Sequence, residues 1–152
     1  MRTIYTDGAC RTSTGSGGWA YVVVEHEDDG TARETARRTG SNAKSTNNRM
    51  ELTAVCVALE DHPNEALHIR VDSTYVFNGV STLVWHWRDN GWLTKSSHKP
   101  VTNQDLWERL LTALEAREIE TTWERIPGHN GNVWNELCDK LAVAESRQPR
   151  AQ

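Results

Sequence analysis

The sequence contains no hydrophobic run long enough to cross a membrane, and its first residues lack the apolar core of a signal peptide. Neither membrane association nor export is therefore expected. Cysteine is also scarce, with Cys10, Cys56 and Cys138 as the three in the chain. An odd number of widely spaced cysteines in apolar surroundings is typical of reduced thiols rather than of disulfides. These absences predict a cytoplasmic protein.

Basic residues are not in excess either. The 152 residues include 17 Lys and Arg against 21 Asp and Glu, which gives a formal net charge of −4 and a pI near 5.9. The overall charge therefore gives no signal for nucleic acid, and any such binding must come from a local basic patch. A phosphate-binding P-loop is excluded too, because the glycine-rich stretch 11–18 lacks the Gly-Lys-Ser/Thr ending of that motif.

The chain length and the hydrophobic content of 37% suit one α/β domain with one core. We predict this domain at residues 1–145, followed by a disordered tail at 146–152. Alternating apolar residues and turn residues predict an antiparallel meander of three strands up to residue 39, with later strands at 67–72 and 119–126. Helical spacing predicts helices at 49–60, 75–89 with a break near Gly79, 105–116 and 133–145. Asn48 is the expected N-cap of the first helix.

An acid ends the first predicted strand. Asp7 follows the strand formers Ile4 and Tyr5 and is followed by Gly8, which allows a tight turn or the close approach of another group. A carboxylate near the core is costly unless it is paired or binds a metal. Taken alone, Asp7 is better interpreted as a solvated turn residue, so a metal site depends on finding partner carboxylates.

Four further residues have both a functional and an ordinary explanation. Glu51 lies on an apolar flank of its helix, but its spacing from Asn48 is also that of a capping box. Asp72 ends its strand where ligands gather in α/β sheets, but it is equally suited to cap the next helix. Asp139 flanks the buried side of the last helix and is otherwise an ordinary solvated acid. His129, in a glycine-flanked loop, becomes a credible proton carrier only if this loop faces the acids.

Five motifs carry a resemblance to a known family. They are T-D-G-A-C at 6–10, T-N-N-R-M-E-L at 46–52, V-D-S-T-Y-V at 71–76, G-H-N-G at 128–131 and N-E-L-C-D-K-L-A at 135–142. Together they resemble bacterial-type ribonuclease H1, over residues 2 to about 144. The second and the last motif are specific in combination, and all five keep the order that they have in that family.

The resemblance implies a ribonuclease H-like fold, a five-stranded mixed sheet flanked by helices, in which the antiparallel meander is followed by parallel strands. It also implies two bound Mg²⁺ ions, with Mn²⁺ as a substitute, held by Asp7, Glu51, Asp72 and Asp139. In the family the first of these acids bridges both ions, an acid matching Glu136 often assists, and His129 matches a mobile histidine that aids proton transfer or product departure. Carboxylates suit such hard cations, and the cations relieve the repulsion between the carboxylates.

The substrate that the resemblance implies is the RNA strand of an RNA–DNA hybrid, cut to leave 3′-hydroxyl and 5′-phosphate ends. Distinguishing RNA from DNA requires contacts to 2′-hydroxyls in the shallow minor groove, and Asn47 and Asn48 match the residues that lie there. Thr46 matches a residue that grips a DNA-strand phosphate, and backbone groups near Cys10 are expected to contribute. Because such contacts position a duplex without reading its bases, little sequence preference is expected.

Two positions depart from the family's pattern. Ser13 stands where the family has an asparagine that meets the substrate, and Thr74 stands where the family has a glutamine. Both changes concern substrate affinity rather than metal binding. Gly8 keeps the family's glycine, whose missing side chain is expected to let the scissile phosphate approach the metals.

Residues 84–101 match the family's basic handle, a helix and loop that contact the hybrid. The candidate contacts in this chain are Trp85, Trp87, Arg88, Trp92, Lys95 and Lys99. The tryptophans are also explained as core residues, which we favour for at least one of them, and Asp89 offsets part of the positive charge. Since phosphate affinity grows with the number of neutralised contacts, we expect weaker and less salt-sensitive binding than with a lysine-rich handle.

Two alternative functions use the same residues. A structure-specific DNA nuclease could share the sheet and the metals, but the Asn47–Asn48 pair and the handle argue against it. A catalytically inactive hybrid-binding module would be favoured by the loss of any one acid, and all four are present. If Glu51 and Asp72 were only helix caps, the order of the motifs would stay unexplained. We therefore expect an endoribonuclease that acts on hybrid duplexes as a monomer.

Overall fold

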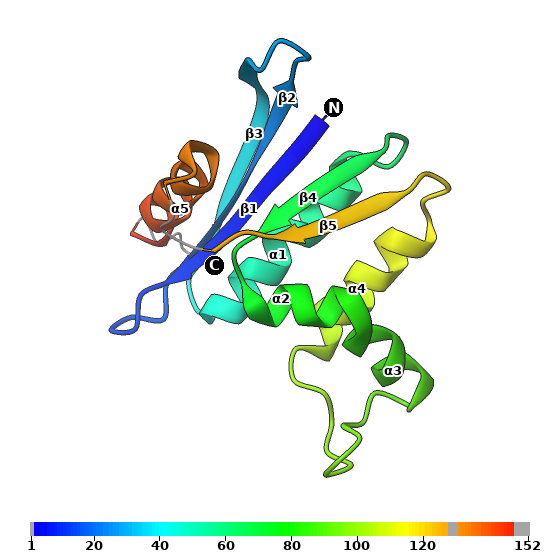
Figure 1. Cartoon of the computed structure of the whole chain (residues 1–152). Helices are drawn as coiled ribbons and strands as arrows, with labels where there is room; N and C mark the ends of the chain where they lie inside the picture. The colour runs from blue at the N-terminus through cyan, green and yellow to red at the C-terminus, as the bar shows by residue number, and fades with distance from the viewer. Residues whose placement is uncertain (1, 128–130, 148–152) are drawn as a thin grey trace.

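The computed structural model describes residues 2–127 and 131–147. Its sheet has five strands in the order β3-β2-β1-β4-β5. They are β1 (Arg2–Cys10), β2 (Gly17–His26), β3 (Ala32–Asn42), β4 (Leu67–Val71) and β5 (Thr121–Arg125). Neighbours among β1, β2 and β3 pair antiparallel, whereas β4 pairs parallel with both β1 and β5. The predicted mixed sheet with its N-terminal meander is therefore confirmed (Figure 1).

The helices cover both faces of this sheet. They are α1 (Asn47–Asp61), α2 (Thr74–Asn78), α3 (Val84–Asp89), α4 (Gln104–Glu115) and α5 (Val133–Ser146). α1 packs on one face with α4 beside it, and α5 packs on the other face against β1 and β2 (Figure 1). β1 is the middle strand of the sheet, and helices cover both of its faces.

The sheet separates two groups of buried side chains. Successive residues of a strand point to opposite faces, so Ile4 packs with the α1 and α4 side chains while Tyr5 packs with Cys138 of α5. The same alternation directs Gly8 toward α1 and Asp7 toward the α5 side. An ionisable side chain buried as deeply as Asp7 in a central strand is exceptional. The end of the sheet where Asp7 lies is therefore the candidate for a functional site.

The predicted helix 75–89 is continuous but changes its winding where the break was expected. A π-helical turn, η1 (Gly79–Leu83), joins α2 to α3. A Cβ atom on Gly79 would overlap the ring of Trp107, which is fully buried. The glycine therefore allows α2 to lie directly on this tryptophan.

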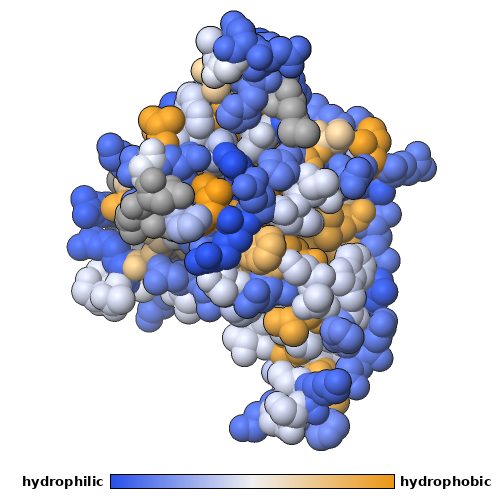
Figure 2. All heavy atoms as spheres, in the orientation of Figure 1, coloured by the Kyte–Doolittle hydropathy of each residue, from blue (hydrophilic) through white to orange (hydrophobic). Residues whose placement is uncertain are grey.

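The last helix extends beyond its predicted end. α5 includes Ser146, which is buried, so the helix reaches into the stretch expected to be a tail, and positions 148–152 lie outside the described residues. Among the described helices, none combines the length and the apolar character needed to span a membrane. On the face that Figure 2 shows, hydrophobic residues lie in small groups between hydrophilic ones.

Candidate metal centre

Three carboxylates meet at one end of the sheet. Asp7 lies near the end of β1, Asp72 directly follows β4, and Glu51 is on the first turns of α1. Because β1 and β4 are parallel neighbours in which Thr6 pairs with Val71, both strands deliver an acid to the same edge. One carboxylate oxygen from each of the three acids lies within 4.8 Å of the other two.

The surroundings of Asp7 are poorly suited to an isolated charge. Its side chain is buried, Oδ1 accepts a hydrogen bond of 2.8 Å from the Gly8 N–H, and Oδ2 is buried without a hydrogen-bond partner among the described residues. Burial, with the nearby charge of Asp72 adding, raises the pKa of Asp7 to about 7. Burial and the neighbouring Asp7 also raise the pKa of Glu51 well above its ordinary value.

These properties fit a divalent cation. Mg²⁺ takes oxygen ligands, chiefly carboxylates, and a cation between the acids would offset both their burial and their mutual repulsion. The unpaired Oδ2 of Asp7 is the buried oxygen that such an ion would satisfy. The residues present therefore fit a metal ion at this position.

The capping explanations for Glu51 and Asp72 are wrong. The N-cap of α1 is Thr46 rather than Asn48, since the Thr46 hydroxyl accepts a hydrogen bond from Arg49 N. The helix thus begins two residues earlier than predicted, and Glu51 lies beyond the capping-box position. The N-cap of α2 is Ser73, whose hydroxyl accepts from Val76 N. Neither Glu51 nor Asp72 is therefore the N-cap of a helix.

Gly8 determines how closely α1 approaches β1. A Cβ atom at this position would overlap the backbone of Met50 and Glu51. The bare glycine lets the first turns of α1 rest on the strand, and this contact brings Glu51 beside Asp7. This packing role is separate from the expected role of Gly8 in admitting a phosphate, which stays a prediction.

The acids of α5 lie farther from the centre. Asp139 is half-buried and close enough for its charge to help raise the pKa of Asp7, although it is not one of the three clustered acids. Glu136, one turn earlier, is exposed in the first turn of α5. His129 lies outside the described residues.

The residues expected to meet the substrate surround this end of the sheet. Asn47 and Asn48 are exposed in the first turn of α1 directly after Thr46. The Cys10 thiol donates to the Ser45 carbonyl at 3.2 Å, which joins the end of β1 to the segment before α1. Two more candidates are exposed, Ser13 in the β1–β2 turn and Thr74 at the start of α2.

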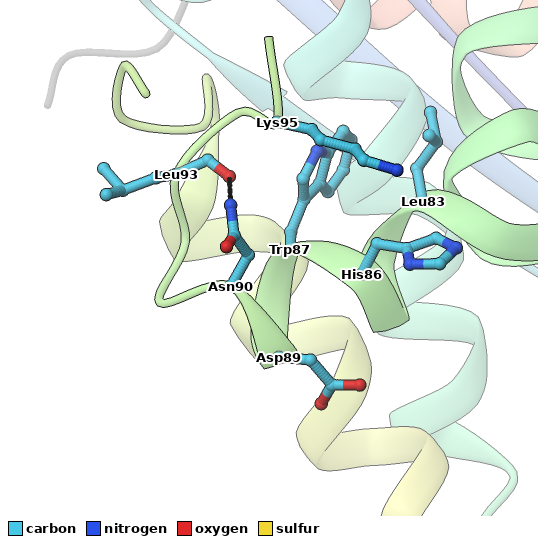
Figure 3. Close-up of a pocket in the computed structure, with 7 residues that line it drawn as sticks. All are labelled: Leu83, His86, Trp87, Asp89, Asn90, Leu93 and Lys95. Carbon is cyan, nitrogen blue, oxygen red and sulfur yellow. Dashed lines mark hydrogen bonds between the residues drawn. The ribbon is translucent and has the colours of Figure 1, made fainter. Parts of the chain in front are cut away.

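The three handle tryptophans are partly buried and pack against the main core. Trp87 also lines a surface pocket of about 310 Å³ together with Leu83, His86, Asp89, Asn90, Leu93 and Lys95. In Figure 3, Lys95, His86 and Leu83 extend to one side of Trp87, while Asn90 and Leu93 lie on the other and are joined by a hydrogen bond of 3.0 Å. The structure therefore supports a core role for these tryptophans without removing a surface role for Trp87.

The charged handle residues differ in whether their side chains are already bound to other side chains of the protein. Lys95 and Lys99 are exposed. Arg88 lies over the Trp85 ring, at 5.1 Å from its centroid, and donates to Glu115 of α4 at 3.0 Å. Arg88 is thus already engaged within the protein, which the sequence pattern did not indicate.

The chain is similar to known proteins over most of its length. Residues 1–147 match the family model described as RNase H. A protein named Ribonuclease H from Treponema pallidum subsp. pallidum is 42% identical over an alignment of 156 positions, which covers 96% of this chain and 90% of that protein.

Two solved structures are also similar. LC9-RNase H1, described as a type 1 RNase H with the type 2 active-site motif, is 28% identical with a TM-score of 0.77, over 98% of this chain and 73% of that one. The foamy viral protease-reverse transcriptase in complex with RNA/DNA hybrid has a TM-score of 0.84 at 22% identity, over 97% of this chain and 20% of that one. The second likeness shows a shared fold alone.

Proposed function

The chain belongs to the RNase H family, and from this premise we propose that it is an endoribonuclease that hydrolyses the RNA strand of RNA–DNA hybrids. The observation that carries the proposal is the meeting of Asp7, Glu51 and Asp72 within 4.8 Å at the end of the central strands. The Treponema relative is named Ribonuclease H. The acid cluster supplies the site in which the chemistry would take place.

We propose two Mg²⁺ ions as cofactors. Asp7, Glu51 and Asp72 would hold one ion, and Asp7 with Asp139 would hold the other, with Glu136 as a further ligand. When bound, such ions lower the pKa of water and neutralise charge on the attacking and leaving oxygens. Asp7 is proposed to serve both ions because its carboxylate is close enough to feel the charges of both Asp72 and Asp139.

The remaining residues would bind and orient the hybrid. Asn47 and Asn48 are exposed at the start of α1, and they are proposed to contact the minor groove of the hybrid. Selectivity for the RNA strand then follows from contacts to its 2′-hydroxyls. His129 is proposed to aid proton transfer or the departure of the product, so that its loss would slow turnover without abolishing it.

The proposal is tested with end-labelled RNA–DNA hybrid, double-stranded RNA and double-stranded DNA, each incubated with Mg²⁺ or with excess chelator. We expect cleavage of the hybrid alone, in its RNA strand, with 3′-hydroxyl and 5′-phosphate ends. Chelator should abolish cleavage, because it removes the ions proposed to activate the water and to neutralise charge on the reacting oxygens. Hybrid cleavage that persists in chelator, or equal cleavage of duplex DNA, would contradict the proposal.

Hybrid binding should depend only weakly on salt. Each phosphate contact adds about 0.9 to the slope of log K against log salt for duplex DNA, and Arg88 is already paired with Glu115 and Asp89 at 3.0 and 3.5 Å. In chelator, where cleavage is blocked, fluorescence anisotropy should give a shallow slope. The double substitution of Lys95 and Lys99 by Ala should lower it by about 2.

Glu115→Gln is the matched change in the opposite direction. It keeps the size of the side chain but removes the shorter of the two ion pairs of Arg88 and leaves the one with Asp89 at 3.5 Å. The slope should therefore steepen by up to about 1. A wild-type slope as steep as that of proteins with about six to ten phosphate contacts would contradict this prediction.

A further inference from the structure

Two ion pairs join α1 to α4, one at each end of α1. Near the metal centre, the Arg49 guanidinium donates to both carboxylate oxygens of Asp105, at 2.9 and 2.7 Å. At the far end, Arg109 donates to both oxygens of Glu60, at 2.7 and 2.6 Å. The pairs are alike in type and geometry. They differ in their distance along α1 from the acids, because Arg49 is two residues from Glu51 whereas Glu60 is nine residues from it.

Asn103 extends the near pair to a third element. Its backbone is left-handed, with φ 61° and ψ 31°, and its side chain does not cap α4, although it occupies the N-cap position. Oδ1 accepts from Arg49 Nη1 at 3.2 Å, and Nδ2 donates to the Tyr75 hydroxyl at 3.1 Å. Both ends of the amide are therefore used to link α1 with α2.

Tyr75 is itself anchored in the core. Its hydroxyl also accepts from Trp107 Nε1 at 3.0 Å. Trp107 is fully buried, with Trp87 against it at 5.4 Å between ring centroids. Tyr75 follows Asp72 by three residues. The chain Arg49–Asn103–Tyr75 thus connects the helix that carries Glu51 to the segment that carries Asp72.

This connection opposes the repulsion that the charged acids exert on one another when no cation lies between them. Carboxylates within 4.8 Å of one another repel when charged, and the repulsion pushes α1 and the segment after β4 apart. A hydrogen-bonded bridge between rigid elements limits that separation, and metal affinity depends on ligands held at a fixed spacing.

We propose that Asn103 and Tyr75 are positioning residues that hold Glu51 and Asp72 at the spacing needed to bind a divalent cation. They touch no ligand atom and act through α1 and α2. The inference rests on the proposed metal site. It goes beyond that site by assigning part of the affinity for metal to a hydrogen-bonded bridge outside the acids.

The test compares three variants by calorimetric titration with Mg²⁺ alone. Asn103→Gly removes the amide while tolerating the left-handed backbone, and Tyr75→Phe removes only the hydroxyl. Glu60→Gln is the control, since it weakens the α1–α4 contact at the far end. We expect the Mg²⁺ dissociation constant to rise about tenfold or more in the first two variants, the lower end of the roughly 10–100-fold scale on which groups that support metal ligands act, and to stay within about twofold of the wild type in the control.

A kinetic split separates positioning from general destabilisation. In Asn103→Gly and Tyr75→Phe the Mg²⁺ concentration for half-maximal cleavage should rise, whereas the rate at saturating Mg²⁺ should stay near that of the wild type. Unfolding midpoints in chelator show whether each variant is folded, and either variant alone suffices for the comparison.

Two outcomes would overturn the proposal by itself. One is wild-type Mg²⁺ affinity in a folded Asn103→Gly or Tyr75→Phe variant, and the other is an equal loss of affinity in Glu60→Gln. If the wild-type protein itself binds no Mg²⁺, the proposed metal site fails, and this inference fails with it. The wild-type titration therefore distinguishes the two failures.

Discussion

Replacing Asp7 by Asn should lower the rate of hybrid cleavage by about 10³-fold or more, the scale expected when a central catalytic group is lost. Asparagine has nearly the same shape as aspartate but carries no charge, so it is a poor ligand for a hard cation. Cleavage within tenfold of the wild-type rate would contradict the proposed role of Asp7. The control is Asp28→Asn in the exposed β2–β3 turn, which should leave the rate unchanged.

The same substitution should stabilise the protein in the absence of metal. The pKa of Asp7 is about 7 in the fold, against an ordinary value of 3.8. Between these values the folded state binds the proton more tightly than the unfolded chain, so the contribution of Asp7 to stability is fully present below about pH 4 and is lost as the pH rises toward 7. A difference of about three pKa units corresponds to a loss on the order of 4 kcal/mol.

Urea denaturation in chelator at pH 5 and pH 8 measures this effect. The free energy of unfolding of the wild-type protein should be lower at pH 8, and Asp7→Asn should recover much of the difference. Added Mg²⁺ should raise the wild-type value at pH 8, because it binds the folded state alone. Equal stability of the wild type and Asp7→Asn at pH 8 in chelator would contradict the electrostatic account.

Gly8→Ala should damage both stability and activity. The added Cβ would overlap backbone atoms of Met50 and Glu51, and a backbone can yield only if α1 moves. We expect a loss of about 1–3 kcal/mol or more in the free energy of unfolding, as for other overpacked positions. Since α1 would carry Glu51 away from Asp7, cleavage should fall about 10²-fold, the effect of a displacement near 1 Å.

Gly30→Ala provides the matched control. Gly30 lies in the β2–β3 turn with φ +89° and no atom within 4 Å of an added Cβ. Its substitution should therefore lower stability through backbone strain but leave the cleavage rate of the folded protein unchanged. If Gly8→Ala behaved in the same way, the packing of α1 on β1 would not be what brings the acids together.

The strands of the sheet were predictable from local patterns, whereas the grouping of the acids was predicted only through the resemblance of the five motifs to a known family. Strand formers lead into Asp7, and alternating residues lead into Asp72. Once β1 and β4 are parallel neighbours, Asp7 and Asp72 must lie at the same end of the two strands. Glu51 joins them because helical spacing directs it to the apolar side of α1. The contact of α1 with Gly8, which brings Glu51 beside Asp7, is visible only in the structure.

The errors lie where distant residues decide. Thr46 and Asn48 are both good N-caps, and the start of α1 is held by Arg49 binding Asp105, which lies 56 residues away in the chain. The link from Asn103 to Tyr75 likewise has no signature in a local window. The pairing of Arg88 with Glu115, which lowers the effective charge of the handle, is also visible only in three dimensions.

The two edge strands have a consequence for self-association. An edge strand offers unpaired N–H and C=O groups to another chain and invites aggregation. β3 exposes Arg33, Arg37 and Arg38 and meets β2 through a register shift at Val23/Val24, while β5 is only five residues long. Charges, a bulge and a short edge all discourage sheet-to-sheet growth. The fold thus exposes its sheet edges in a form that resists fibril formation.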